Sequence, residues 1–444
     1  MNAVTDAEID ATASGVTAEP VSSSERLISL DVLRGVAVLG ILVMNIYAFA
    51  MPFIAYSNPL AMGGLEPLNI GTWFFTHILF DQKFMSIFSM LFGAGMILMA
   101  ERAEEQGVRF AGILYRRQFW LLVLGLIHAY LIWFGDILFF YAVVGMIIYV
   151  FRKKSPITLI VIASLLLPVT LLFSFAGGTY MQDLKIRAEA LLVQQAAGET
   201  LSEADQATID EWAEERSFLV PGQEELEKEL IAYSGGYADN LEHRVPFVWS
   251  FQMEGLPFFI VWRVGGMMLI GMALMKLGIL SAKESVRLYR NLMIAGYTVG
   301  LPLTTFSAVN AYWHAFEPLY MLRVGMIPNY IGSIFVALGH IGLVMLIVKT
   351  GVLRVLVDRF AAVGRMALTN YLMHSVVMTT IFYGYGFGLY GTVPRFWQMW
   401  FAVGLVALQL ALSPWWLARY RFGPAEWLWR SLTYGQRQAM RRRQ

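Results

Sequence analysis

The chain has 444 residues, of which 57 % are hydrophobic and only 15 % are charged. That is too little charge to cover the surface of a water-soluble protein of this size. The net charge of +1 provides no overall field for nucleic acid, and the lack of cysteine excludes disulfides, thiolate nucleophiles and thiolate metal sites. The composition therefore predicts an all-α, polytopic membrane protein whose main partner is the lipid bilayer.

The two ends of the chain are hydrophilic. Residues 1–26 are rich in Ala, Ser, Thr and acidic residues and lack a basic segment before an apolar one, so they do not resemble a cleaved secretory signal. We expect them to form a disordered cytoplasmic tail. Residues 431–444 carry several arginines and are expected to form a second, basic cytoplasmic tail.

Apolar segments long enough to cross a bilayer recur along the chain between these tails. They predict about ten transmembrane helices, at 27–53, 84–100, 119–134, 137–151, 157–176, 257–277, 292–313, 327–348, 361–385 and 396–417. Residues 69–80 fit either an interfacial helix on the outer face or the start of a long second span.

Lys and Arg are unevenly divided among the connecting loops. One alternating set is basic, with Arg102, Arg109, Arg116 and Arg117, then Arg152 to Lys154, then Lys283, Arg287 and Arg290, then Lys349, Arg354 and Arg359. The other set is almost free of bases, since 51–68 has none and the last such loop has only Arg395. Basic loops stay in the cytoplasm. We therefore expect a protein of the bacterial inner membrane with both termini on the cytoplasmic side.

One sizeable hydrophilic segment interrupts the spans. Residues 178–250 carry many acidic side chains and are expected to form a helical insertion on the extracytoplasmic side, whose charges are most simply a solvated surface. The insertion would divide the membrane part into an N-terminal bundle, 27–177, and a C-terminal bundle, 251–430.

Polar side chains inside apolar spans are energetically costly and mark candidate functional positions. In the first span, Arg34 and Asn45 are eleven residues apart and fall on one helix face, while Asp31 is close enough to pair with Arg34. The pair fits either a binding site or an anchor at the membrane interface. In the second span, Gln82 begins a stripe of polar or small residues that fits either a cavity or close helix packing.

Two histidines lie within predicted spans. His128 is followed by Asp136, a carboxylate that would orient the imidazole if the intervening turn allowed contact. His374 shares a helix face with Asn370, beside Tyr371 and below Arg365. Either histidine fits a structural role or a general base, and the company of Asn370 favours His374.

Several motifs are specific enough to indicate a family. They are LDVLRG at 30–35 with Asn45, QKF at 82–84, LFGAG at 91–95, GDIL at 135–138, GRMALTNYL at 364–372 and GPAEWLWR at 423–430. With them the chain resembles the YeiB family of bacterial inner-membrane proteins over nearly its whole length. The chain contains no metal-ligand spacing, P-loop or nucleophile elbow of the common types.

The first four spans are also similar to heparan-alpha-glucosaminide N-acetyltransferase and related transmembrane acyltransferases, which move acyl groups from cytoplasmic acyl-CoA to acceptors across the membrane. This resemblance implies that no cofactor is tightly bound and that acyl-CoA is the donor substrate. The chain departs from the pattern in one respect, because residues 46–68 contain no histidine where that family has its catalytic one. His128 or His374 would then have to act as the base.

Two hypotheses follow. The first is an acyltransferase that passes an acyl group to a hydroxyl or amine of a periplasmic, lipid or glycan acceptor, with a homodimer as a further expectation. Its candidate catalytic residues are His374, His128, Asn45 and Asp136, and its candidate donor-binding residues are Arg34, Asp31, Gln82, Arg365, Asn370 and Tyr371. The second is a transporter or exporter of a small or amphipathic molecule, although the repeats typical of such proteins are not evident.

Overall fold

The computed structural model describes residues 27–107, 110–219 and 222–442. These ranges are helical and contain no β-strand, only an isolated bridge between Tyr420 and Arg441. This confirms the all-α fold class. The predicted N-terminal tail, Arg109 and Arg443 lie outside the described residues.

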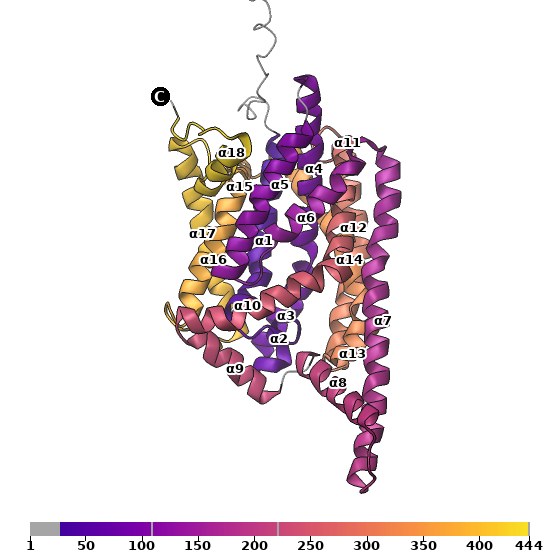
Figure 1. Cartoon of the computed structure of the whole chain (residues 1–444). Coiled ribbons are helices and arrows are strands. Elements are labelled where there is room, and N and C mark those ends of the chain that lie inside the picture. Colours follow the sequence, from indigo (N-terminus) through magenta and orange to yellow (C-terminus); the bar gives the residue numbers. More distant parts are fainter. Residues whose placement is uncertain (1–26, 108–109, 220–221, 443–444) are drawn as a thin grey trace, which may run out of the picture.

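The first half of the chain forms the helices from α1 to α9 (Figure 1). Their bounds are α1 Ile28–Ala50, α2 Ile54–Ser57, α3 Pro67–Leu79, α4 Lys83–Glu105, α5 Phe110–Ile127, α6 Leu138–Ile148, α7 Pro156–Ala196, α8 Glu203–Leu219 and α9 Gln223–Ser234.

The second half forms the helices from α10 to α18. Their bounds are α10 Tyr237–Met253, α11 Val261–Lys276, α12 Val286–Trp313, α13 Pro318–Tyr320, α14 Ile327–Thr350, α15 Arg354–Arg365, α16 Ala367–Phe382, α17 Arg395–Arg419 and α18 Pro424–Tyr434.

Eight helical segments in the described residues are long and apolar enough to cross a membrane. Two of the ten expected spans are shorter in the structure. The span expected at 137–151 contains α6, which has 11 residues, and the one expected at 361–385 is divided into α15 and α16 at Met366. A polytopic membrane protein is thus confirmed, while the number of crossings stays a prediction.

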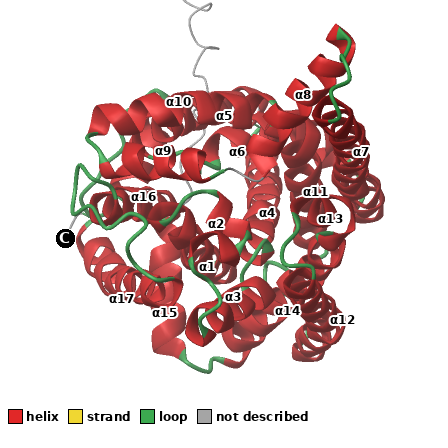
Figure 2. Ribbon diagram, turned by 90° about the horizontal axis from the view of Figure 1, so that it is seen from below, coloured by secondary structure: helices red, strands yellow, loops and turns green. Residues whose placement is uncertain are grey.

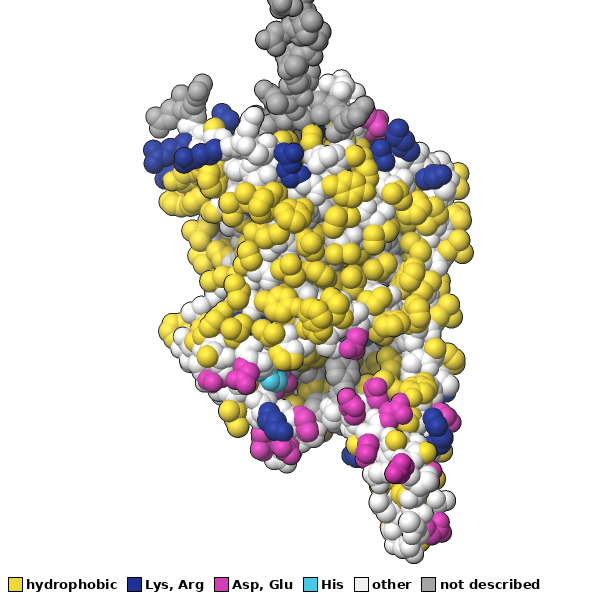
Figure 3. Space-filling model, in the orientation of Figure 1, with side chains coloured by type: hydrophobic (Ala, Val, Ile, Leu, Met, Phe, Trp, Pro, Cys, Tyr) yellow, Lys and Arg dark blue, Asp and Glu magenta, His cyan; other side chains and the backbone are white. Residues whose placement is uncertain are grey.

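The two ends of the molecule differ in charge. Lys and Arg gather at the end that carries α15 and α18, Asp and Glu gather at the end that carries α8 and α9, and a band of hydrophobic side chains separates them (Figure 3). We call these the basic end and the acidic end. The separation of charge agrees with the expected orientation, in which the basic end faces the cytoplasm. The orientation itself stays a prediction.

The acidic segment is continuous with the membrane helices. α7 is 41 residues long and runs through the expected boundary at 177/178, and α10 runs through the one at 250/251. The segment 69–80 forms most of α3, which is separated from α4 by a break where Gln82 adopts a left-handed backbone, with φ of 63°.

Glycines allow helices of the two expected bundles to pack against each other. A Cβ on Gly93 would lie 2.0 Å from the Met268 carbonyl oxygen, and one on Gly364 would lie 1.8 Å from the Asp31 carbonyl oxygen. These contacts join α4 to α11 and α1 to α15, so both halves share one core. Viewed from the acidic end, α1 lies near the middle of the bundle (Figure 2), and 78 % of its apolar window is buried.

Candidate active site

A cavity of about 390 Å³ lies at the basic end, between α1, α4, α5, α6, α16 and α18. Its lining combines basic side chains with apolar and aromatic ones. Five arginines contribute to the lining, Arg34, Arg102, Arg117, Arg365 and Arg430. Among the described residues of the lining the acidic ones are Asp31 and Glu426, so cationic side chains predominate there.

Asp31 and Glu426 are each held by a protein partner. The Arg34 guanidinium donates to Asp31 at 3.0 Å, which is the pair that the sequence predicts. Glu426 accepts from the backbone N–H groups of Leu368 and Thr369 at 2.6 and 3.1 Å. These N–H groups belong to the first turn of α16 and lack partners within their own helix. Burial raises the pKa of the Glu426 carboxyl above its ordinary value, although these hydrogen bonds act to lower it.

Arg117 lies against the helix that closes the basic end. Its guanidinium lies 3.6 Å from the ring centroid of Trp429 in α18. The Trp429 indole N–H in turn donates to the Arg117 carbonyl oxygen at 2.9 Å. The amphipathic helix α18 is therefore fixed to α5 by the same two residues that line the cavity.

Two tyrosines line the deep part of the cavity. The Tyr141 hydroxyl is hydrogen-bonded to Ser89 at 2.9 Å. The Tyr371 hydroxyl accepts from the Ile137 N–H and donates to the Gly135 carbonyl oxygen, both at 3.2 Å. Tyr371 is thus fixed against the turn that contains Asp136.

Behind Tyr371 lies a buried chain of three polar side chains. His128 Nδ1 is 2.8 Å from Asp136 Oδ1, and His128 Nε2 is 2.8 Å from the Ser375 hydroxyl. The three residues are at most 2 % exposed. The ring centroids of His128 and Tyr371 are 5.1 Å apart. These three hydrogen-bonded side chains therefore lie directly behind the cavity wall that Tyr371 forms.

Local structure explains why His128 meets Asp136. The end of α5 widens into a π-helical turn at His128–Ile132, and the Trp133 N–H closes it on the His128 carbonyl oxygen. The chain then reverses through Gly135, and the second oxygen of Asp136 accepts from the Phe139 N–H at 2.7 Å in the first turn of α6. Asp136 therefore holds the start of α6 and the imidazole together.

His374 belongs to a different polar cluster. His374 Nε2 is 2.8 Å from Gln409 Oε1, and the Gln409 amide donates to the Asn370 carbonyl oxygen at 3.0 Å. The Asn370 amide donates to Val363 and Ser413. The predicted link between His374 and Asn370 thus runs through α17. Arg365 and Tyr371 belong to the described lining of the cavity, whereas His374 and Asn370 do not.

The other predicted positions are also divided. Arg34 and Asp31 line the cavity, but Asn45 and Gln82 are missing from the described lining residues. In the stripe that starts at Gln82, Ser86 accepts from Arg263 and Ser89 contacts Tyr141. Ser375 was missed by the sequence analysis. Its spacing of four residues from Tyr371 was the available signal.

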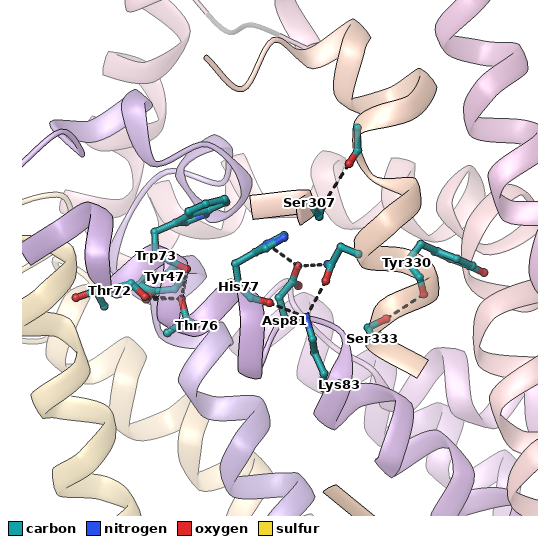
Figure 4. A network of polar contacts seen from close by, with 12 residues as sticks. Tyr47, Thr72, Trp73, Thr76, His77, Asp81, Lys83, Ser307, Tyr330 and Ser333 are labelled. Carbon is teal, nitrogen blue, oxygen red and sulfur yellow. Dashed lines mark hydrogen bonds and ion pairs between the residues drawn. The ribbon is translucent and has the colours of Figure 1, made fainter. Parts of the chain in front are cut away.

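A second buried polar network joins α3, α4 and α14 (Figure 4). Asn329 donates to Asp81 at 2.8 Å and accepts from Lys83 at 2.7 Å. Lys83 also donates to the His77 carbonyl oxygen, and His77 Nδ1 is 3.3 Å from Asp81. Nearby, Arg263 donates to Ser86, Ser333 and the Tyr330 carbonyl oxygen.

Comparisons with known proteins agree on the family. Residues 274–436, which include α16 and α18, match the family described as "Protein of unknown function (DUF418)". The chain is 33 % identical over 426 residues to "Uncharacterized protein YxaH" of Bacillus subtilis (strain 168), covering 94 % of this chain and 96 % of that protein.

A second relative is nearly as similar. "Uncharacterized protein YeiB" of Escherichia coli (strain K12) is 32 % identical over 414 residues, covering 92 % of this chain and 96 % of that protein. No solved structure matches the chain. None of these descriptions includes an activity, so the resemblance to acyltransferases stays a prediction. The chain belongs to the family that includes YeiB and YxaH.

Proposed function

We propose that this protein is a transmembrane acyltransferase. It takes an acyl group from acyl-CoA at the basic end and transfers it to a hydroxyl or amine that arrives from the acidic end. The observation that carries the proposal is the cavity, in which arginines at the basic end lead to an apolar interior that stops beside a buried histidine–carboxylate pair.

The lining of the cavity suits the two chemical parts of acyl-CoA. Guanidinium groups bind phosphate oxygens through paired, charge-assisted hydrogen bonds. Arg34, Arg117 and Arg430 would hold the phosphates near the mouth, while Phe88 and Phe92 would contact the pantetheine arm and the acyl chain. A volume of about 390 Å³ is in the range of small-molecule sites. It suits the arm and a short acyl group, with the nucleotide at the mouth.

His128 is the base in this proposal. The sequence favours His374, but His128 is the histidine that contacts the cavity wall through Tyr371 and is paired with a carboxylate. In the reaction the thioester C–S bond breaks and a C–O or C–N bond forms. Overall the acceptor loses a proton and the departing CoA thiolate gains one, and His128 is the group that moves protons. A thioester is already activated, so no cofactor is required.

The test uses purified protein with acetyl-CoA and palmitoyl-CoA as separate donors. We expect Arg34→Ala to weaken donor binding about tenfold or more, since a hydrogen bond to a charged group contributes about 1.5–3 kcal/mol. Arg290→Ala is the matched control, because Arg290 is an exposed arginine of α12 outside the cavity lining. Binding would be measured by calorimetry, and release of free CoA after addition of membrane lipid would be measured with a thiol reagent.

The alternatives give different results. If Arg34 only anchors α1, Arg34→Ala lowers thermal stability and leaves donor affinity unchanged. If the cavity belongs to a transporter, the protein releases no CoA with either donor but moves an amphipathic anion across vesicles. Either outcome contradicts the corresponding part of the proposal.

A further inference from the structure

The imidazole of His128 faces a serine rather than the cavity. Its Nδ1 is paired with Asp136, which favours the tautomer that carries its proton on Nδ1. The lone pair is then on Nε2, 2.8 Å from the Ser375 hydroxyl. The proton nearest to the base is therefore the one on Ser375.

We propose that Ser375 is a nucleophile that carries the acyl group between two half-reactions. The inference rests on the proposed acyl-transfer function and specifies its route. A hydroxyl, a histidine and a carboxylate at successive hydrogen-bond distances are the arrangement that activates serine in unrelated hydrolases and transferases. Here the serine comes from α16, the histidine from the end of α5 and the carboxylate from the turn before α6.

The hydroxyl of Ser375 has its partner on another segment of the chain rather than on its own helix. By contrast, the buried hydroxyls of Ser86 and Ser89 each donate to the carbonyl oxygen four residues earlier in their own helix. Within the described structure Ser375 makes no such bond and is directed at His128 instead. A serine hydroxyl with a purely structural role could donate to a carbonyl oxygen of its own helix and would not need the imidazole.

The position of Ser375 separates the two substrates. Tyr371, one helical turn earlier on the same face, forms the wall of the donor cavity next to Ser375, and its side chain must move aside for the thioester carbon to reach the serine hydroxyl. On the other side, the ring centroid of Trp133 lies 6.3 Å from that of His128 and 4.0 Å from that of Phe49, on which it stacks. Ring contacts then lead from Trp133 through Phe134 to α9 at the acidic end. A covalent intermediate lets the donor leave before the acceptor reaches the site, so the membrane need not be open on both sides at once.

Both half-reactions balance. In the first, Ser375 Oγ attacks the thioester carbon, its proton passes to His128 Nε2, the C–S bond breaks and the thiolate takes that proton. In the second, the acceptor O–H or N–H gives its proton to His128, its oxygen or nitrogen attacks the ester carbon, and Ser375 leaves with the proton. The buried Trp133 indole N–H has no partner in the described structure and is a donor available to the developing oxyanion.

The experiment omits the acceptor. Wild-type protein is mixed with acetyl-CoA or palmitoyl-CoA, and we expect a burst of about one CoA per protein and an acyl mass increment on the peptide that contains Ser375. Ser375→Ala should abolish the burst and the adduct and lower transfer to membrane lipid by roughly 10³-fold or more. Ser413→Ala, a buried serine on α17 that contacts Asn370, is the matched control and should keep both.

Ser375→Cys provides a test that does not depend on the alanine variant folding. It should form an adduct that neutral hydroxylamine removes, as a thioester is removed and a serine ester is not. If the wild type transfers acyl groups without an adduct and Ser375→Ala transfers at the same rate, the nucleophile is overturned while the proposed function stands. If the wild type releases no CoA under any of these conditions, both are overturned.

Discussion

Charged side chains gather in two regions within the helix bundle, and their surroundings differ. In the network of α3, α4 and α14, Asn329 bridges Asp81 and Lys83, and protein groups accept the hydrogen bonds of Lys83. In the cavity at the basic end, arginines line a volume of about 390 Å³. A buried charge is tolerated when protein groups replace its water. The first region therefore stabilises the fold, whereas the second is where we propose that the anionic donor binds.

The largest expected effect breaks the network. Asp81→Asn removes the carboxylate and leaves Lys83 and Arg263 as buried cations, which should lower the free energy of unfolding by about 3–5 kcal/mol. The thermal unfolding of detergent-solubilised protein would measure this. The affinity for acyl-CoA, measured at a temperature where the variant is folded, should stay within about twofold of wild type. The reason is that Asp81, Lys83 and Arg263 do not belong to the described lining of the cavity.

A double variant checks that the effect belongs to the network. Asp81→Asn combined with Lys83→Met removes both charges, so it should destabilise the protein less than the sum of the two single changes. Additive losses would show that the two side chains act independently and that the bridge through Asn329 contributes nothing.

An intermediate effect is expected in the cavity. Arg117→Gln removes one cation and its stacking on Trp429, so the free energy of donor binding should weaken by about 1.5–3 kcal/mol, equivalent to roughly 10- to 150-fold in affinity. Arg117→Lys keeps the charge and should lose less. The pattern should be the reverse of Asp81→Asn, with a larger change in binding than in stability. Unchanged affinity in a folded Arg117→Gln protein would place the phosphates elsewhere.

The smallest effect is a pH dependence at the junction of α16 and α18. Because the folded-state pKa of Glu426 is raised, the folded protein binds more protons than the unfolded chain between the two pKa values. The stability from this group is fully present below the unfolded pKa and is lost as pH rises through the folded one. Glu426→Gln should therefore show a smaller loss of melting temperature between pH 5 and pH 8. Parallel curves for both proteins would contradict this assignment.

Parts of the site were visible in the sequence because they depend on local spacing. Asp31 and Arg34 are three residues apart on one helix, so their pairing follows from helix geometry alone. The separation of basic and acidic loops likewise reflects residue order. By contrast, the predicted partnership of Arg34 with Asn45 used the same geometry but could not include the neighbouring helices, and only Arg34 lines the cavity.

The sequence by itself determined that the chain is an all-α membrane protein of the YeiB family, because apolar length and motif identity are properties of consecutive residues. Only the tertiary structure decided which polar groups meet. Ser375 reaches His128 across 247 positions of sequence, and Asp136 reaches it because a π-helical turn ends α5. Such contacts depend on packing between distant segments, which periodicity along one helix does not specify.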